Sequence, residues 1–453
     1  MWGDYPAGAH FFRPAARLCF TPEPGSGTHG RVRRSLAGLS ILLLSASALA
    51  VAPATADASA LDLFGYGGRS PALAGTGISF TDSFDALYTN PAGLSEARQK
   101  RMSVGFMASN FDLHYALKDR DVDPVMGVIV GGDVPIPFGG ALKDRITIGI
   151  GLHVPPLLLS RAVAPLPGEP FLALLEHRGQ VVAFMVGAGA RITRHISVGI
   201  ASLSLAALGG FIDVSADPTK RFTSTAEQQL LVDYAPIAGV RWRPSKKLSA
   251  GIVYRGQSAA KFDILVTNMI GDALPVTLPA IRVRGYSQYD PRMVEAEASY
   301  QVLPRLSVTG ALAWKQWSSF PPPTEDPVID APPRVRPGFS DTFVPKLAAR
   351  FTLNPKVELR GGYRLELTPA PEQTGRENLL DNTRHIITAG AGFKFAPNGV
   401  PIRIDAYVQA HFLAPRTSTK DQTLAPEDRD PTYLSVSSSG KILVGGLTFG
   451  VDL

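Results

Sequence analysis

The sequence predicts an all-β membrane protein, a fourteen-stranded antiparallel β-barrel that crosses the membrane with its strands. Three observations favour this class: an apolar–polar alternation with a period of two residues, a succession of short and long connections between the predicted strands, and a secretory signal near the start of the chain. Glycine (44) and proline (38) are frequent among the 453 residues and follow no collagen-like period. Such a composition is typical of many strands joined by turns.

The period-two alternation is clear in several segments after residue 100. In residues 145–154 every even position is apolar, while the odd positions carry Arg, Thr, Gly, Gly and His. Residues 356–367 and 401–412 follow the same rule, and residues 440–453 end on it. Each segment is therefore a predicted strand with one apolar and one polar face. A soluble sandwich would bury the apolar face, whereas a membrane barrel turns it to lipid and keeps the polar face inside.

Connection lengths favour the membrane barrel over the sandwich. Short links are predicted at 193–195, 244–247, 303–305, 354–355 and 397–400, and long ones at 156–179, 208–233, 269–290, 318–342, 368–383 and 414–439. Short turns at one end and long loops at the other are typical of bacterial outer-membrane barrels. With 248–268 counted as one long strand, the predicted strands are 102–116, 125–136, 146–155, 181–192, 196–207, 234–243, 248–268, 292–302, 305–317, 343–353, 356–367, 384–396, 401–413 and 440–453.

The lengths and ends of the predicted strands also suit a bilayer. Most of them have about ten residues or more, which is enough to cross a bilayer when the strand is tilted. Aromatic residues near several strand ends predict an interfacial girdle: Trp314, Trp317, Tyr363, Phe395 and Phe412.

The first sixty residues predict a leader and a signal peptide that are removed. Basic residues at 31–34, an apolar run at 36–51 and small residues at 58–60 correspond to the three regions of a secretory signal. Cleavage is expected after Ala60, and a retained membrane anchor is the alternative. The single cysteine, Cys19, lies in this segment, so no disulfide and no thiolate metal site are expected in the mature chain.

Residues 61–98 show neither a period of two nor a long amphipathic helix. Residues 67–77, Asp82, Asp85 and residues 88–94 closely resemble the N-terminal hatch of the long-chain fatty acid transporter family, which also contains aromatic-hydrocarbon uptake channels. Later segments resemble the same family, and the similarity extends over residues 61–453: 313–320, 359–363, Thr368 with Pro369, and Asp381 with Arg384.

The resemblance implies a fourteen-stranded barrel, residues 99–453, with a hatch, residues 61–98, inside its lumen. It implies a bacterial outer-membrane channel, and not an enzyme, for passive uptake of hydrophobic compounds such as long-chain fatty acids or aromatic hydrocarbons. The ligand would bind in the lumen and leave sideways through the barrel wall. One departure is the last residue, Leu453, because such barrels usually end in Phe. The expected substrate contacts are three apolar residues at the start of the hatch: Leu61, Leu63 and Phe64.

The expected partners follow from the same resemblance. They are a hydrophobic small molecule, outer-membrane lipid and the barrel-assembly machinery. We expect a monomer without a cofactor. The charge is spread along the chain rather than gathered in a stripe, so no nucleic-acid partner is expected.

The family's Asn-Pro-Ala element corresponds to Asn90, Pro91 and Ala92, which Gly93 follows. An Asn side chain can bond neighbouring backbone groups and Pro fixes φ, so this sequence predicts a rigid turn. Within the longer resemblance these four residues are expected to anchor the hatch to the wall. A plain turn is the alternative.

The third predicted strand is a candidate lateral gate. Its Gly149 and Gly151 are followed by Pro155 and Pro156. Glycine weakens a strand interior and proline cannot donate to the sheet, so we expect this strand to pair imperfectly. In the family that the chain resembles, an inward kink of the third strand opens the wall to the bilayer. The alternative is that the glycines make room for luminal side chains and the prolines only end the strand.

Catalytic motifs are missing from the sequence. It contains no Gly-x-Ser-x-Gly, His-Glu-x-x-His, EF-hand or Walker pattern. Carboxylates on polar strand faces have arginines beside them, so a wetted lumen explains them without catalysis: Glu295, Glu297, Glu358 and Glu366. Two competing functions remain. A barrel hydrolase acting on lipids would need an acid, His and Ser facing one cleft, and a structural or adhesive barrel would lack a continuous apolar path.

Overall fold

The computed structural model describes residues 60–115, 118–120, 122, 124–155, 168–176, 181–216, 222–269, 280–326, 328 and 332–453. The predicted signal peptide up to residue 59 and the predicted gate residue Pro156 lie outside the described residues. Neighbouring strands of the barrel are antiparallel, and their order around it is β1 (Arg101–Tyr115), β3 (Val125–Pro135), β4 (Ile146–Val154), β6 (Ala183–Arg191), β7 (Ile196–Ala216), β8 (Phe222–Trp242), β9 (Leu248–Arg255), β12 (Met293–Leu303), β13 (Leu306–Lys315), β14 (Thr342–Asn354), β15 (Val357–Glu366), β17 (Arg384–Phe395), β18 (Ile402–Thr419) and β19 (Ser435–Asp452).

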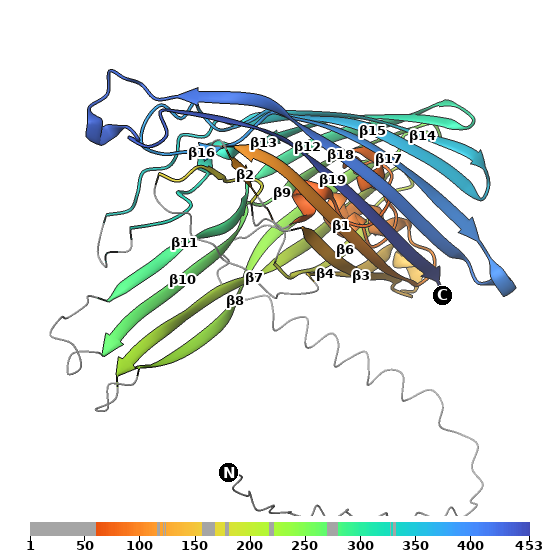
Figure 1. The fold of residues 1–453 in the computed structure, drawn as a ribbon. Helices are drawn as coiled ribbons and strands as arrows, with labels where there is room; N and C mark the ends of the chain where they lie inside the picture. Colours follow the sequence, from red (N-terminus) through yellow and green to blue (C-terminus); the bar gives the residue numbers. More distant parts are fainter. Residues whose placement is uncertain are drawn as a thin grey trace, which may run out of the picture. The chain divides into compact units, whose positions relative to one another are not determined.

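Pairing of the first and last strands closes the barrel. β19 pairs with β1 from Arg101↔Asp452 to Tyr115↔Ser438. The closed antiparallel barrel of fourteen strands confirms the predicted fold class (Figure 1). Both chain ends of the barrel lie at the end with the short turns, which faces the periplasm in outer-membrane barrels. We call this the turn end and the opposite end the loop end.

The alternation predicted from the sequence places apolar side chains outside and polar ones inside. In β4, Ile148 and Ile150 face outward, whereas Thr147 and His153 are buried. In β15, Leu359 and Tyr363 are exposed, whereas Arg360 and Arg364 are buried on the luminal face. A barrel in lipid requires this arrangement because lipid tails cannot solvate charge. Among the described residues, no helix is long and apolar enough to cross a membrane.

The prediction of a single strand over 248–268 is wrong. This segment forms β9 and a separate strand, β10 (Ser258–Met269), joined at Gly256 and Gln257. The β8–β9 ladder ends at Ile237↔Arg255, directly beside Pro236, which has no N–H to donate. A Cβ at Gly256 would lie 2.7 Å from the Pro236 ring, so the chain turns away from the barrel wall where glycine permits close approach.

Two predicted loops are strands that extend beyond the barrel. β10 pairs in parallel with the C-terminal part of β7, from Phe262↔Leu208 to Met269↔Ser215, and antiparallel with β11 (Ile281–Asp290). The predicted loops 208–233 and 269–290 therefore contain the ends of β7 and β8 and all of β11 (Figure 1). Sequence alternation missed them because these segments do not lie between lipid and lumen. The count of fourteen holds because β10 and β11 lie outside the barrel ladder.

Short elements occupy the connections. They are β2 (Lys118–Arg120), η3 (Gly140–Leu142), β5 (Phe171–Leu172), η4 (Trp317–Ser319), β16 (Leu379–Leu380), η5 (Pro397–Gly399) and η6 (Pro426–Asp428). β5 and β16 pair in parallel with each other. The prediction that Trp317 belongs to a lipid-facing girdle is wrong, because its ring is buried against Tyr289 and Phe320. It packs in a loop cluster because η4 turns the chain inward after β13 ends.

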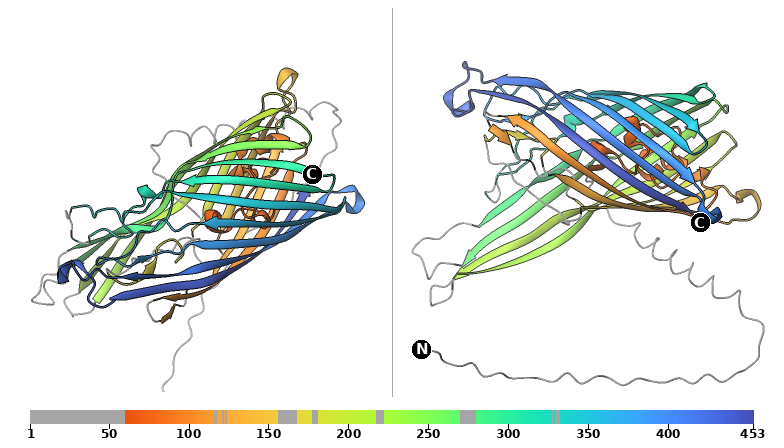
Figure 2. Two further views of the ribbon diagram at one scale, coloured as in Figure 1. Left: turned by 90° about the horizontal axis from the view of Figure 1, so that it is seen from above. Right: turned by 45° about the vertical axis from the view of Figure 1, so that its right-hand side comes forward.

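The segment before β1 lies inside the barrel, as a hatch (Figure 2). It consists of α2 (Ala60–Phe64), η1 (Pro71–Leu73), α3 (Ala86–Thr89) and η2 (Pro91–Glu96), joined by turns. Nearly all of its side chains are buried although its helices are very short. Its stability must therefore come from contacts with the barrel wall, since isolated helices of this length are not stable.

Candidate functional site

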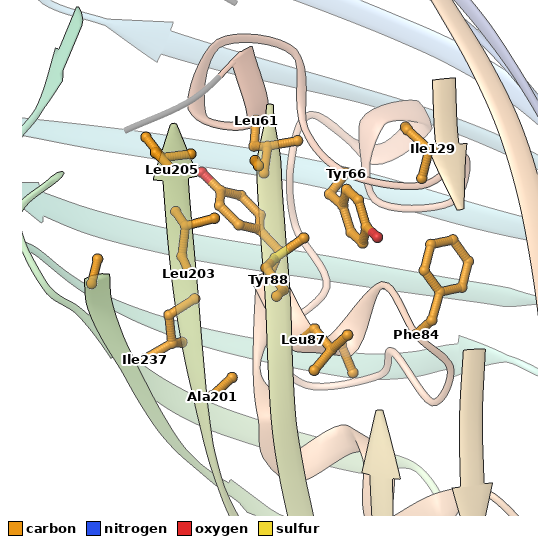
Figure 3. Packing of buried hydrophobic residues seen from close by; sticks show 14 of the residues in the cluster. Leu61, Tyr66, Phe84, Leu87, Tyr88, Ile129, Ala201, Leu203, Leu205 and Ile237 are labelled. Atoms are coloured by element: carbon orange, nitrogen blue, oxygen red, sulfur yellow. The ribbon is translucent and has the colours of Figure 1, made fainter. Parts of the chain in front are cut away.

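One arc of the lumen has an apolar inner surface. Side chains from β6, β7, β8 and β9 form this apolar wall, which packs against Leu61, Leu87 and Tyr88 of the hatch (Figure 3). The wall residues are Ala183, Met185, Ala201, Leu203, Leu205, Ala235, Ile237 and Val253. Barrel lumens are usually polar, so an apolar wall of this extent distinguishes this arc of the lumen from the rest.

The next arc of the lumen, from β12 to β17, is charged. Its buried inward residues form the charged wall: Glu295, Glu297, Lys315, Lys346, Arg360, Arg364, Glu366 and Arg384. As predicted, carboxylates of this face lie beside arginines and lysines: Glu295, Glu358 and Glu366 are ion-paired. Glu297 instead accepts hydrogen bonds from the hatch. The hatch lies between the two walls and contacts both.

The predicted anchor residue Asn90 is fully buried between the hatch and β8. Its Oδ1 accepts the Ala92 N–H at 3.1 Å, and its Nδ2 donates to the carbonyls of Ile78 at 2.9 Å and of Val240 at 3.1 Å. The Ile78 bond joins two parts of the hatch, and the Val240 bond joins the hatch to the wall. Asn90 also caps η2, in which Pro91, Ala92 and Gly93 follow.

Glycines of three neighbouring strands form the floor on which this turn rests. A Cβ at Gly239 would lie 2.1 Å from Asn90 Oδ1, and one at Gly199 would lie 2.2 Å from the Pro91 carbonyl carbon. A Cβ at Gly189 would lie 2.5 Å from the Pro91 oxygen. We call these residues of β6, β7 and β8 the glycine floor. Sequence reasoning missed it, although inward-facing glycines in three successive strands were a usable signal.

Charged residues of three barrel strands and of the hatch itself hold the hatch segment 77–82. Glu297 of β12 accepts the N–H groups of Gly77, Ile78 and Ser79 at 2.7, 3.1 and 2.8 Å, together with the Ser79 hydroxyl at 2.5 Å. The next three carbonyls each accept a guanidinium: Phe80 from Arg69, Thr81 from Arg241 and Asp82 from Arg101. Charge-assisted bonds are the stronger class, so this segment is firmly attached to β1, β8 and β12.

The expectation that the third barrel strand pairs imperfectly is wrong. β4 pairs with β3 from Val128↔Val154 to Pro135↔Thr147, and with β6 from Ile146↔Ala190 to His153↔Ala183, without a register shift. Glycine keeps both backbone hydrogen-bonding groups, so it does not interrupt the ladder. Pro155 follows the last paired residue and only ends the strand.

The two glycines of β4 make room for the hatch. A Cβ at Gly149 would lie 3.0 Å from Leu94 Cδ2. A Cβ at Gly151 would lie 2.3 Å from Tyr66 Oη and 3.2 Å from Leu87 Cδ1. The structure therefore places the predicted gate residues directly against three hatch side chains, and the wall is closed at this strand.

The three predicted substrate contacts lie together on α2 but face different parts of the lumen. Leu61 packs with the apolar wall, whereas Leu63 and Phe64 pack with a second apolar cluster on β1, β18 and β19. The Phe64 ring lies 6.2 Å from that of Phe111, edge to face. A cavity of about 30 Å³ lies beside α2 and is lined by Leu61 and Asp62 together with charged wall residues such as Lys315 and Glu366.

Asp62, the charged residue of α2, was not singled out by sequence reasoning. Its carboxylate lies 2.7 Å from Lys315 Nζ and 3.8 Å from the Arg255 guanidinium. Glu366 lies 3.2 Å from the same Lys315 nitrogen and 2.6 Å from Arg384. No local motif could have revealed these pairs, because their members are far apart in the sequence.

A larger cavity, of about 690 Å³, lies among the loops. Its lining is mixed and includes Glu169, Arg334, Arg376, Glu377 and Asp430. Burial raises the pKa of the Glu377 carboxyl in this cavity. Beside these loops, Phe320 stacks on Phe339 with ring centroids 4.3 Å apart, and Tyr289 meets Phe320 edge-on.

A closed barrel with an apolar outer band, an internal hatch and an apolar luminal wall defines an outer-membrane transport barrel. The family described as outer membrane protein transport protein (OMPP1/FadL/TodX) matches residues 182–451, more than half of the chain. The chain belongs to this family, as the hatch and later segments predicted. It is accordingly a bacterial outer-membrane transport protein and not an enzyme.

Individual relatives agree with this assignment. Alkane uptake protein A of Marinobacter nauticus is 21% identical over 404 residues, which cover 82% of this chain and 86% of that protein. A FadL homologue from Pseudomonas aeruginosa shares the fold with a TM-score of 0.55 and 13% identity, over 85% of this chain and 97% of that one. The toluene transporter TodX of Pseudomonas putida gives a TM-score of 0.53 and 16% identity, over 86% and 99%.

Proposed function

We propose that this transport protein takes up hydrophobic compounds, hydrocarbons or long-chain fatty acids, by passive binding in the lumen and lateral release through the wall. One observation carries the proposal: a continuous series of buried apolar side chains extends from the loop end to β6 and β3, the two strands that pair with β4. Ala259 of β10 belongs to the aromatic loop cluster, and its neighbour Ala260 belongs to the same buried cluster as the apolar wall. The same apolar wall includes Met185 of β6 and packs with Ile129 of β3, on either side of β4. A structural barrel would not need such a path.

The attachment of the hatch favours a lateral exit over a straight one. Segment 77–82 is held by charged groups of three strands, so clearing the lumen towards the turn end would break many charge-assisted bonds. Exit near β4 would require apolar side chains such as Leu87 and Leu94 to leave Gly149 and Gly151. It would also require the ladder between β4 and a neighbouring strand to open. A lateral route also keeps the ligand out of water, which is worth about 0.8 kcal/mol for each methylene. In this proposal Asn90, Pro91, Ala92 and Gly93 anchor the hatch, while Leu61, Leu63 and Phe64 contact the substrate.

Cross-links that fix β4 to its neighbours test the lateral route. We would introduce the paired, lipid-facing positions Val130 and Leu152 as cysteines, and in a second variant Ile150 and Val186. The mature chain is expected to have no other cysteine, so each pair can form only one bond. Of these four residues, Val130 accepts a hydrogen bond from Tyr66 of the hatch, but through its backbone carbonyl, which a cysteine retains. We expect oxidation to abolish uptake of labelled dodecane by cells in at least one variant, and reduction to restore it.

The matched control is a cross-link between Val104 of β1 and Phe449 of β19, which are also paired and lipid-facing. It should form equally well and leave uptake unchanged under oxidation. Full uptake by both oxidised β4 variants would show that this strand is not the exit. Absence of uptake by the unmodified protein, with folding verified, would contradict the transport of hydrocarbons itself.

A further inference from the structure

Helix α2 separates the apolar and charged parts of the lumen. Leu61, Leu63 and Phe64 are buried in the apolar clusters, and the residue between the first two is an aspartate that points to the charged wall. A ligand bound beside α2 would therefore meet apolar surface on one side and the partners of Asp62 on the other. The charge state of those partners determines which ligands can enter.

Each described cation that contacts α2 already has a partner. Lys315 bonds to both Asp62 and Glu366. Arg255 donates to the Tyr88 carbonyl at 2.9 Å and hydroxyl at 3.0 Å, and its guanidinium lies 3.8 Å from the centre of the same ring.

The remaining cations of this region are occupied as well. Arg364 donates to the Leu63 carbonyl at 3.0 Å and lies 3.6 Å from Glu366. Lys346 bonds to Glu295 at 2.7 Å, and Arg384 to Glu366 at 2.6 Å. A carboxylate arriving beside α2 would find no cation without a partner, and it would lie close to Asp62 and Glu366. Among the described residues, the five cations face only three carboxylates, Asp62, Glu295 and Glu366, so net charge does not repel the ligand; its binding is opposed by desolvation and by the need to displace Asp62 from Lys315.

We propose that Asp62 is a specificity-determining residue, which makes this channel select uncharged hydrocarbons over ligands that carry a carboxylate. The proposal rests on the proposed function and narrows its substrate class. Asp62 already binds Lys315 at the position where the carboxylate of a ligand would have to bind. An intramolecular group acts at a high effective concentration, of the order of millimolar or above, so a dilute carboxylate competes poorly with it. A hydrocarbon needs no ionic partner, so the Asp62–Lys315 pair does not reduce its binding affinity.

The test compares dodecane with dodecanoate, which have the same chain length and differ in the carboxylate. Binding of each radiolabelled ligand to the immobilised, detergent-solubilised mature protein is measured, with empty micelles as background. We expect the unmodified protein to favour dodecane. Asp62→Asn keeps the size of the side chain and removes its charge, so that the ligand can take the place of Asp62 on Lys315 while Glu366 stays bound to it. It should shift the preference towards dodecanoate by about tenfold or more, the value of one charge-assisted bond.

Three further variants serve as controls for this result. Asp62→Glu retains the charge and should keep the original preference. Asp62→Asn combined with Lys315→Gln should lose the gained dodecanoate binding, because the cation is gone. Glu358→Gln removes a luminal carboxylate that is paired with Arg360, at the turn end, and should keep the original preference.

Two results would overturn the inference while leaving hydrocarbon transport intact. One is an unmodified protein that binds dodecanoate as tightly as dodecane. The other is an Asp62→Asn variant whose preference equals that of the unmodified protein. If folded, unmodified protein bound neither ligand, both the proposed function and this inference would fail.

Discussion

The replacement of Glu297 by glutamine should release the hatch. The two oxygens of Glu297 accept four hydrogen bonds from Gly77, Ile78 and Ser79. Glutamine has nearly the same shape but replaces one oxygen by an NH2 group, which faces N–H donors and cannot accept. Two bonds are lost and the others lose their charge assistance. At about 1.5–3 kcal/mol for each bond to a charged group, the docked hatch is destabilised by about 3–6 kcal/mol.

Single-channel recording in planar bilayers measures this effect. A change of about 3–6 kcal/mol raises the population of undocked hatch by about 10²–10⁴-fold, since about 1.4 kcal/mol corresponds to a factor of ten. We expect frequent openings of large conductance in Glu297→Gln and rare ones in the unmodified protein. Glu358→Gln serves as the control, because it removes the same charge without a hydrogen bond to the hatch. Equal conductance in Glu297→Gln and the unmodified protein would refute the role assigned to these four bonds.

Three further predictions concern the hatch and the barrel. Deleting residues 61–98 should raise the conductance of every channel, and an unchanged conductance would argue against a plug. Gly239→Val places methyl groups where Asn90 lies, so the hatch should become sensitive to protease in folded barrels. Gly310→Val is the control: Gly310 has open space around it, and its replacement should leave the hatch resistant. The protein recovered from outer membranes should shift in gel mobility on boiling, because the closed barrel unfolds only when heated. A gel mobility that does not depend on heating would contradict this stability of the barrel.

The barrel was predictable because lipid imposes a strict local rule. Ile148 and Ile150 had to face outward if Thr147 and His153 faced inward, and any one strand reveals this alternation. The rule contains no information about pairing partners. It therefore could not show that the chain leaves the barrel ladder at Gly256, or that β10 joins β7 rather than β9.

The site was predictable only where a short motif carries the geometry. The turn at Asn90 follows from its own side chain and from Pro91. The contacts of Glu297 with the hatch and of Asp62 with Lys315 join residues more than 200 positions apart, and charge pairing over such distances leaves no local pattern. Gly149 and Gly151 were recognised as unusual, but only the structure shows that they accommodate Leu94, Leu87 and Tyr66.

The long-range contacts of the hatch determine when it can fold. The hatch precedes every barrel strand in the chain, yet its partners include Glu297 of β12 and Thr388 of β17, which accepts the Ala74 N–H at 3.0 Å. Its helices are too short to persist alone. Until those strands are in place, its leucines and aromatic rings remain exposed to water and prone to aggregation. The hatch thus precedes every barrel strand in synthesis and follows most of them in reaching its final structure.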